Sequence, residues 1–302
     1  MPVQVKDYRK YLDPSIISKL KTLELKARAV VEGFKVGLHR SPYHGFSAEF
    51  SEHRPYMQGD SLKDVDWKVF AKSERYYIKQ YEEETNLICN ILIDSSKSMQ
   101  FKQNGEITKL DYAITLAASL AYLMIDQQDA VGLTVYSDKI KNYLTPKANR
   151  VYLKTLLTAL NNIEPSGLTS TARCLDDIAE KIKKRGLTII ISDFFDDPDS
   201  IVTALKHVHH KKNEVIVFQI LDPIEKSFGF DRDAIFVDLE TEEQLTTQPV
   251  QIQKAYQEAM NQYLGKLKNG CLNFGIEYNV IETNQPFDKA LLSYFAKRAK
   301  MN

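Results

Sequence analysis

A short polar segment directly follows an apolar run in the first third of the chain. The run spans Leu87–Ile93, and Asp94, Ser96 and Ser98 come next. If the run is a buried strand, these residues lie in the loop at its carboxyl end, which is where open α/β sheets bind ligands. The spacing Asp-x-Ser-x-Ser is common by chance, so its meaning depends on what other parts of the chain bring to the same loop.

Two later segments carry oxygen-bearing side chains in comparable positions. Thr169 belongs to the loop Pro165–Thr169, and Asp193 follows a second apolar run, Leu187–Ser192. Parallel strands end at the same edge of a sheet, so the loops that follow them can meet there. We therefore expect Thr169 and Asp193 to approach the Asp-x-Ser-x-Ser segment.

Oxygen ligands of this kind suit a hard divalent cation. Mg²⁺ prefers oxygen atoms in a near-octahedral array and keeps several waters, and Mn²⁺ or Ca²⁺ accepts similar ligands. We expect the three hydroxyls to bind the cation directly and the two carboxylates to bind it directly or through water. The predicted metal-binding residues are Asp94, Ser96, Ser98, Thr169 and Asp193. Because the protein supplies so few charges, the cation would still attract a carboxylate from a partner protein.

Helix capping is the main structural alternative for the same side chains. Ser96 or Ser98 could cap a following helix, with Asp94 at the positive end of that helix. Thr169 and Asp193 could each cap a later helix. Both interpretations stay open at the level of sequence.

A histidine cluster is a second candidate for metal binding. His207, His209 and His210 lie close together, but lysines surround them and no acidic residue stands among them. We interpret the cluster as a solvated helix end, because positive side chains are favoured at helix C-termini.

The elements around these segments alternate between short apolar strands and amphipathic helices, which is typical of βαβ units around a mostly parallel sheet. We expect strands at Leu87–Ile93, Ala130–Tyr136, Leu187–Ser192, Glu214–Leu221, Ala234–Leu239 and Tyr278–Glu282. We expect helices at Lys109–Ile125, Arg150–Asn161, Thr171–Lys184, Asp199–His209, Gln251–Leu267 and Phe287–Lys300. A hairpin at Ser137–Lys139 should place Ile140–Leu144 antiparallel at one edge. The predicted fold class is α/β, with a doubly wound sheet.

The chain divides by pattern near its first run of acidic residues. Residues 1–83 show a helical apolar pattern and then a polar, aromatic stretch with short strand-like segments, and Glu82–Glu84 marks the best boundary. We predict a smaller N-terminal helix and strand subdomain at 1–83 and the main α/β domain at 84–302.

Motifs that would indicate an enzyme are absent from the sequence. It contains neither G-x-x-x-x-G-K-[ST] nor G-x-S-x-G, and no G-x-G-x-x-G follows a strand. The strongest catalytic alternative is a Mg²⁺-dependent phosphatase of the haloacid-dehalogenase type, with Asp94 as nucleophile. Such enzymes carry a second Asp two residues later, where this chain has Ser96. We therefore expect a protein that is not an enzyme.

A string of motif residues lies upstream of the acidic run. It reads Arg54-Pro55-Tyr56-x-x-Gly59-Asp60 and then Asp66-Trp67-Lys68. This string resembles the signature of the bacterial domain-of-unknown-function family fifty-eight. The Asp-x-Ser-x-Ser, Thr and Asp pattern resembles the metal-ion-dependent adhesion site of von Willebrand factor A domains. The resemblance covers about Leu38 to Asp193, and the two patterns together are far more specific than either alone.

The resemblance implies a von Willebrand factor A-like fold and a role in protein binding. Genes for members are commonly found beside those of MoxR-type AAA+ ATPases, which suggests an adaptor or co-chaperone for such an ATPase or its client. The upstream string would be a network that joins the small subdomain to the large one, with a direct role in partner binding as the alternative. Its residues are Arg54, Asp60, Asp66, Trp67 and Lys68.

Composition narrows the remaining classes. Forty basic and forty acidic residues leave no net charge, so the one-signed field typical of nucleic-acid and membrane-surface binding is missing. The uncharged stretch Tyr112–Ile125 is shorter than the roughly 20 residues of a membrane span. Three widely separated cysteines, Cys89, Cys174 and Cys271, favour reduced thiols and therefore a cytoplasmic location.

Overall fold

The computed structural model describes residues 12–40, 53–55, 76–79, 87–103, 107–211, 213–230 and 234–301. Of the predicted upstream network, Asp60, Asp66, Trp67 and Lys68 lie outside these residues. Only the backbone of Arg54 is described, in strand β1 (His53–Pro55), which pairs antiparallel with β2 (Tyr77–Lys79). The role of the network stays a prediction.

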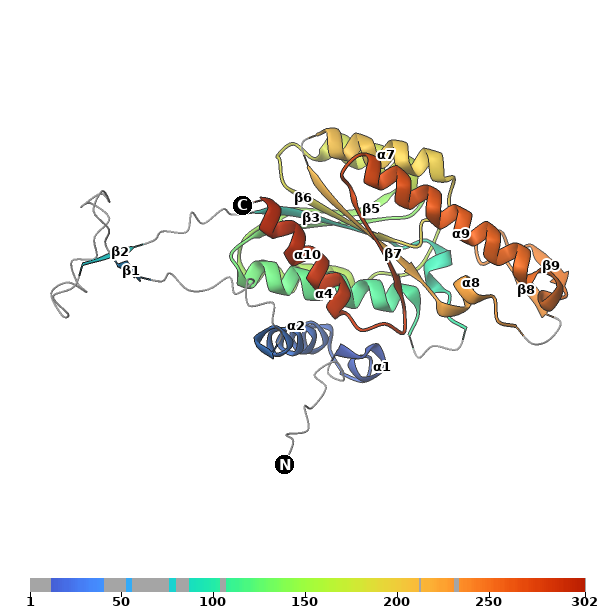
Figure 1. Ribbon diagram of the computed structural model, residues 1–302, viewed down its shortest axis with the longest axis horizontal. Coiled ribbons are helices and arrows are strands. Elements are labelled where there is room, and N and C mark those ends of the chain that lie inside the picture. Colours follow the sequence, from blue (N-terminus) through green and yellow to red (C-terminus); the bar gives the residue numbers. More distant parts are fainter. Residues whose placement is uncertain are drawn as a thin grey trace, which may run out of the picture.

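A six-stranded sheet forms the centre of the molecule (Figure 1), and its strand order is β10-β7-β6-β3-β4-β5. Its strands are β3 (Ile88–Asp94), β4 (Ala130–Tyr136), β5 (Ile140–Lys147), β6 (Leu187–Ser192), β7 (Glu214–Leu221) and β10 (Glu277–Glu282). Neighbouring strands run parallel except for β4 and β5, which pair antiparallel at one edge. This confirms the predicted doubly wound, mostly parallel sheet with its antiparallel edge strand.

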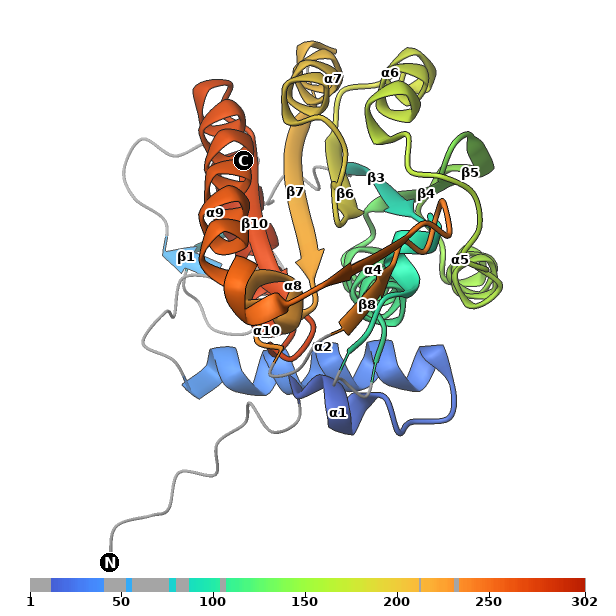
Figure 2. The same ribbon diagram turned by 90° about the vertical axis from the view of Figure 1, so that its right-hand side faces the viewer.

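Helices cover both faces of the sheet (Figure 2). One face packs against α4 (Lys109–Asp126), α5 (Arg150–Asn161) and α10 (Asp288–Met301), and the other against α6 (Thr171–Lys181), α7 (Pro198–His210) and α9 (Pro249–Asn273). Along β3, Ile91 and Ile93 belong to the first core and Leu92 to the second, because successive side chains of a strand point to opposite faces. Burial on both faces explains why these strands are almost continuously apolar.

The first helices pack on the main domain. α1 (Pro14–Ile17) leads to α2 (Leu23–Arg40), which lies across the outside of α4. Buried side chains of α2 belong to the same core as the sheet, and the Phe34 ring stacks on Phe295 with 5.5 Å between the ring centroids. The predicted boundary after residue 83 itself stays a prediction.

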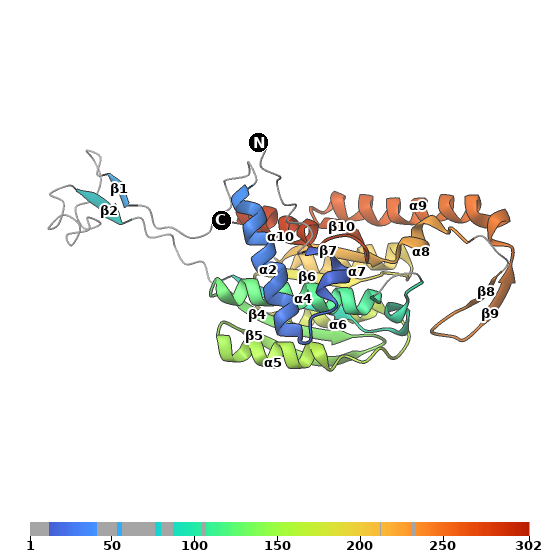
Figure 3. The same cartoon turned by 90° about the horizontal axis from the view of Figure 1, so that it is seen from below.

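One expected sheet strand lies elsewhere. The segment Ala234–Leu239 was predicted to join the main sheet, but β8 (Ala234–Val237) pairs with β9 (Gln244–Thr247) in a separate antiparallel hairpin. Figure 3 shows this hairpin beside α8 (Pro223–Ser227), at the end of the molecule. The reason is that only one side of β8 is covered. Phe236 packs inward on an aromatic cluster, whereas Ile235 stays 62% exposed.

Strands β3 and β6 are neighbours whose following helices leave in opposite directions. The chain passes from β3 to β4 through α4 on one face, and from β6 to β7 through α7 on the other. Such a topological switch point is the usual ligand-binding position of a doubly wound sheet. Among the described residues, no helix combines the length and apolar composition that crossing a membrane requires.

Candidate functional site

The three predicted hydroxyl ligands lie in a row at the carboxyl ends of β3 and β6. Ser96 Oγ lies 3.0 Å from Ser98 Oγ, and Ser98 Oγ lies 3.4 Å from Thr169 Oγ1. Ser96 is fully buried, while Ser98 and Thr169 are partly exposed. The row therefore runs from the interior to the surface, although Ser98 and Thr169 are 71 residues apart in sequence.

The two predicted carboxylates lie beneath this row, and both are fully buried. Asp94 ends β3, where its Oδ1 accepts the backbone N–H of Ser96 at 2.8 Å and its Oδ2 accepts the Ser192 hydroxyl at 2.7 Å. Asp193 follows the neighbouring strand β6. Burial, and after it the negative charge of Asp193, raise the pKa of Asp94 to about 6. The site thus holds two acids whose charges repel each other.

Backbone contacts between two loops bring Thr169 to the site. Ser166 N–H donates to the carbonyl of Ser95 at 2.9 Å, and Lys97 N–H donates to the carbonyl of Gly167 at 3.3 Å. Gly167 has a φ of +83°, and a Cβ there would lie 2.7 Å from Asp138 Oδ1. Because only glycine meets both demands easily, Gly167 sets the path of the loop that carries Thr169.

The capping alternative is wrong for Ser96, Thr169 and Asp193. Ser96 is the N-cap of the short 3-10 helix η3 (Lys97–Gln100), but its side chain makes no capping hydrogen bond. Helix α6 begins after Ser170 rather than Thr169, again without a side-chain cap, and α7 is capped by Asp197. The side chains of Ser96, Thr169 and Asp193 are therefore not employed as helix caps.

A buried lysine is the first site residue that the sequence did not reveal. Lys109 Nζ donates to Asp193 Oδ2 and to Glu225 Oε1, both at 2.7 Å, and lies 4.9 Å from the centre of the Phe195 ring. Burial opposes the charge of Lys109, but Asp193 and Glu225 outweigh it and raise the pKa of the lysine. A signal existed, because Lys109 begins α4 and a cation is unfavourable at a helix N-terminus unless acids surround it.

A glutamate from the β8–β9 hairpin is the second such residue. Glu240 Oε2 accepts the backbone N–H of Thr169 at 2.8 Å, and its Oε1 accepts the Thr169 hydroxyl. The sequence signal was the acidic loop between the two strands, from Asp238 to Glu243. Nothing in the local pattern indicates that this loop contacts a residue 71 positions earlier.

The donor set fits a hard divalent cation. Its predicted carboxylates are Asp94 and Asp193, and Lys109 is shared by Asp193 and Glu225. Among the described residues, no group of three His, Cys, Asp or Glu side chains could hold a metal ion by itself. The remaining ligands would have to be hydroxyls. Two acids, three hydroxyls and an excess of negative charge suit Mg²⁺ or Mn²⁺ rather than a softer metal.

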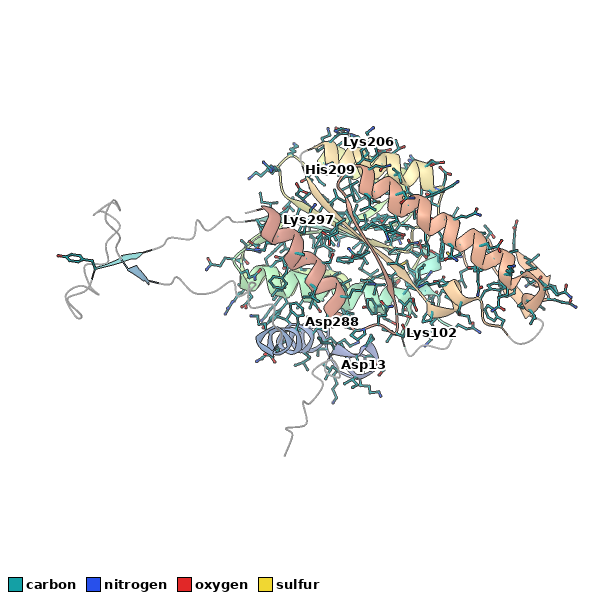
Figure 4. All side chains as sticks on the ribbon, viewed as in Figure 1. Asp13, Lys102, Lys206, His209, Asp288 and Lys297 are labelled. Carbon is teal, nitrogen blue, oxygen red and sulfur yellow. The ribbon has the colours of Figure 1, made fainter. Side chains whose placement is uncertain are left out.

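The histidine cluster differs from its prediction in one respect. His207 does have acidic companions, because α6 supplies Asp176 at 2.9 Å from Nδ1 and Glu180 at 3.1 Å from Nε2. His209 Nδ1 lies 2.9 Å from the carbonyl of Asn213, and Figure 4 labels this residue on α7. The His207 contacts tie α6 to α7 at the surface, and the His209 contact lies at the end of α7, so both histidines have a structural explanation.

Comparison with known sequences gives one family and several relatives. The model of the family described as "Protein of unknown function DUF58" matches residues 52–263. A protein of Mycobacterium bovis and one of Mycobacterium tuberculosis, both described as uncharacterized, are each 25% identical to this chain over 232 residues. The matches cover 76% of this chain and 72% of each relative.

Three solved structures are similar in part. BatB from Bacteroides thetaiotaomicron, a conserved hypothetical protein, is 17% identical with a TM-score of 0.49, covering 72% of this chain and 100% of that one. An aerotolerance-related membrane protein from Bacteroides fragilis is 21% identical with a TM-score of 0.48, covering 70% and 99%. The VWA domain of SpRpn10 is 12% identical with a TM-score of 0.40, covering 68% and 94%. The fold assignment rests on the strand order and helix layers described above.

Proposed function

This chain belongs to the DUF58 family of proteins of unknown function, and we propose its function from its own residues. It is a protein-binding module that requires a divalent cation to bind its partner. The observation that carries the proposal is the row of three hydroxyls above two buried, mutually repelling carboxylates. A bound cation would relieve that repulsion. It would also present an open coordination position for a carboxylate of the partner.

The surroundings of the site favour a protein as partner. Leu168, beside Thr169, is 52% exposed, and Leu239, beside Glu240, also stays exposed. Two cavities of about 450 Å³ lie elsewhere, one beside α1 and α8 and the other between β5 and α5, and none of the five predicted ligands lines them. An exposed, partly apolar rim around charged groups suits a protein surface better than a small molecule.

The contacts of Asp94 support binding rather than catalysis. Both of its carboxylate oxygens accept hydrogen bonds, and its side chain is fully buried, which is unfavourable for a nucleophile. Ser96 stands where the phosphatase alternative requires a second acid, and a hydroxyl is a poor general acid or base near neutral pH. The alternative predicts phosphate release from p-nitrophenyl phosphate in Mg²⁺ that disappears in Asp94→Asn. We expect no such activity above background.

The metal step is tested by calorimetry. Mg²⁺ and then Mn²⁺ are titrated into the wild type, into Asp94→Ala and into the exposed control Asp199→Ala. We expect saturable binding to the wild type and the control and none to Asp94→Ala. Equal heats from all three proteins would refute the metal site.

The partner step is tested by co-purification. The family resemblance suggests a MoxR-type AAA+ ATPase or its client as the partner, with this chain as adaptor or co-chaperone in the cytoplasm. We expect an ATPase of this type to be retained in Mg²⁺ and released by a chelator. Retention that is indifferent to chelation would show that the contact does not use the cation.

A further inference from the structure

The β8–β9 hairpin brings a carboxylate of the chain itself to the proposed cation site. Glu240 accepts two hydrogen bonds from one residue, Thr169, through the backbone N–H and the hydroxyl. We propose that Glu240 is an internal ligand of the cation, and that it holds the coordination position which a partner's carboxylate must take over. The inference rests on the proposed function, since it requires that the site bind a cation.

The chemistry of the Thr169 hydroxyl supports this role. A hydroxyl can offer a lone pair to a cation while it donates its hydrogen to a carboxylate. The Thr169 hydroxyl already donates to Glu240 Oε1, and its oxygen lies 3.4 Å from Ser98 Oγ on the other side. Glu240 therefore lies next to the outermost of the three predicted hydroxyl ligands. That position is on the solvent side of the row, where a partner's carboxylate would also have to approach.

The hairpin loop is ordered in a way that directs Glu240 toward Thr169. Asp238 Oδ1 accepts the backbone N–H groups of Glu240 at 2.7 Å and of Thr241 at 2.9 Å. These two bonds lower the pKa of Asp238. The loop closes through Asp238 N–H to the carbonyl of Glu243 and Glu242 N–H to the carbonyl of Asp238, both at 2.9 Å. The backbone of this loop is thus shaped by its own hydrogen bonds and not only by contact with the site.

One face of the hairpin is anchored by aromatic packing, whereas the opposite face is largely exposed. Phe236 of β8 lies 5.4 Å from Phe228 and 5.1 Å from Phe230, and Phe228 stacks on Tyr256 of α9 at 4.2 Å, measured between ring centroids. On the opposite face, Ile235 is 62% exposed and Val237 is 49% exposed. A hairpin that is anchored on one face only can move its acidic loop away from the site without unfolding the central sheet.

The second acid of the loop provides a matched control. Glu242 Oε1 lies 3.8 Å from Lys97 Nζ, but both side chains are well exposed, so solvent and salt screen the pair. Within the described residues, no hydrogen bond or ion pair joins the Glu242 side chain to a predicted cation ligand. Replacement of Glu242 changes the charge of the hairpin by the same amount as replacement of Glu240, and only the latter removes a ligand.

The test uses the full chain with Mn²⁺ alone as the probe. Calorimetry measures Mn²⁺ affinity and water-proton relaxation measures the water bound to Mn²⁺, in the wild type, Glu240→Gln and Glu242→Gln. We expect Glu240→Gln to weaken Mn²⁺ binding about ten-fold and to raise the relaxation enhancement, because water replaces a charged ligand. We expect Glu242→Gln to stay within about two-fold of the wild type, as a screened surface charge should.

Acetate then stands in for the partner's carboxylate. Added to the Mn²⁺-loaded proteins, acetate should displace water and lower the relaxation enhancement of Glu240→Gln, while the wild type resists the same concentration. Unchanged affinity and relaxation in Glu240→Gln, beside a wild type that binds Mn²⁺, would overturn the role of Glu240 and leave the cation site standing. A wild type that binds no Mn²⁺ would refute both proposals.

Discussion

At the amino end of the sheet, each of two acids has a cation of its own. Arg298 of α10 pairs with the buried Asp129, and the neighbouring Lys297, labelled in Figure 4, lies 2.7 Å from Glu214 at the start of β7. At the carboxyl end, Lys109 is shared by Asp193 and Glu225, and Asp94 forms no ion pair within the described part of the chain. Acids are buried at both ends of the sheet, but only at the amino end does each acid have a positively charged partner of its own.

The difference supports the proposal that one end stabilises the fold and the other binds a cation. A buried acid that has its own cation and hydrogen bonds is costly to disturb, because removal of the cation leaves a buried charge behind. A cluster with surplus negative charge stays less stable than it could be until a further cation arrives. The carboxyl end therefore has the character of a binding site, and the amino end that of a structural support.

The largest expected effect is on the balanced end. Arg298→Met leaves Asp129 buried without its cation and should lower the free energy of unfolding by about 3–5 kcal/mol, with or without Mg²⁺. Arg150→Met is the control, since the Arg150 side chain is 84% exposed and its pair with Asp126 should contribute less than about 1 kcal/mol. Urea denaturation of the wild type and the two variants measures both changes in the free energy of unfolding. A small effect of Arg298→Met would mean that the amino end is not held by its ion pairs.

The next effect concerns the loop that carries Thr169. Gly167→Ala combines a positive φ with a Cβ that would meet Asp138, so we expect a loss of about 2–4 kcal/mol and weaker Mn²⁺ binding. Gly275→Ala has a φ of +69° but open space around the new Cβ, and therefore isolates the backbone strain of about 1–2 kcal/mol. Denaturation and calorimetry distinguish the two. Equal losses in both variants would show that the loop contact does not matter.

A smaller effect, of opposite sign, is expected at the unbalanced end. Asp94→Asn keeps an acceptor for Ser96 N–H and removes one of two repelling charges. In a chelator, this variant should be more stable than the wild type by about 0.5–2 kcal/mol. Added Mg²⁺ should raise the melting temperature of the wild type and not that of the variant. If Asp94→Asn instead destabilises the protein in chelator, Asp94 serves the fold in the same way as Asp129.

The smallest effect is a pH dependence at the amino end. The hydrogen bond from Lys297 lowers the pKa of Glu214, against the opposing effect of partial burial. A lowered pKa in the folded state means that this contribution is present above the unfolded pKa of about 4.3 and is lost as pH falls through the folded value. Glu214→Gln should therefore cost less than about 1 kcal/mol at pH 7, and the cost should be smaller near pH 3. Urea titrations at the two pH values test this, and an equal cost at both would refute it.

Local pattern predicted the central fold well. Ala130–Tyr136, Leu187–Ser192 and Glu214–Leu221 are strands with the predicted bounds, because burial on both faces makes their sequences almost purely apolar. The segment at Ala234 misled because a one-sided strand of a hairpin and a strand of the sheet have similar short patterns. Which partner a strand finds is decided by tertiary packing, here by the ring of Phe236 on Phe228.

The site was predictable only where its residues follow strands. Asp94 and Asp193 come directly after apolar runs, so topology alone places them at one edge. Lys109 and Glu240 reach the site from a helix start and a distant hairpin, across 84 and 71 residues of sequence. No hydrophobic periodicity encodes such contacts. The only signals in the sequence were a lysine at a helix start and an acidic loop in the hairpin.

The most direct test of the metal site is anomalous X-ray scattering from crystals of the full chain grown with Mn²⁺. We predict a Mn²⁺ peak within bonding distance of the hydroxyls of Ser96, Ser98 and Thr169, above the buried Asp94. A protein that takes up Mn²⁺ only elsewhere, with no peak beside those hydroxyls, would contradict the account.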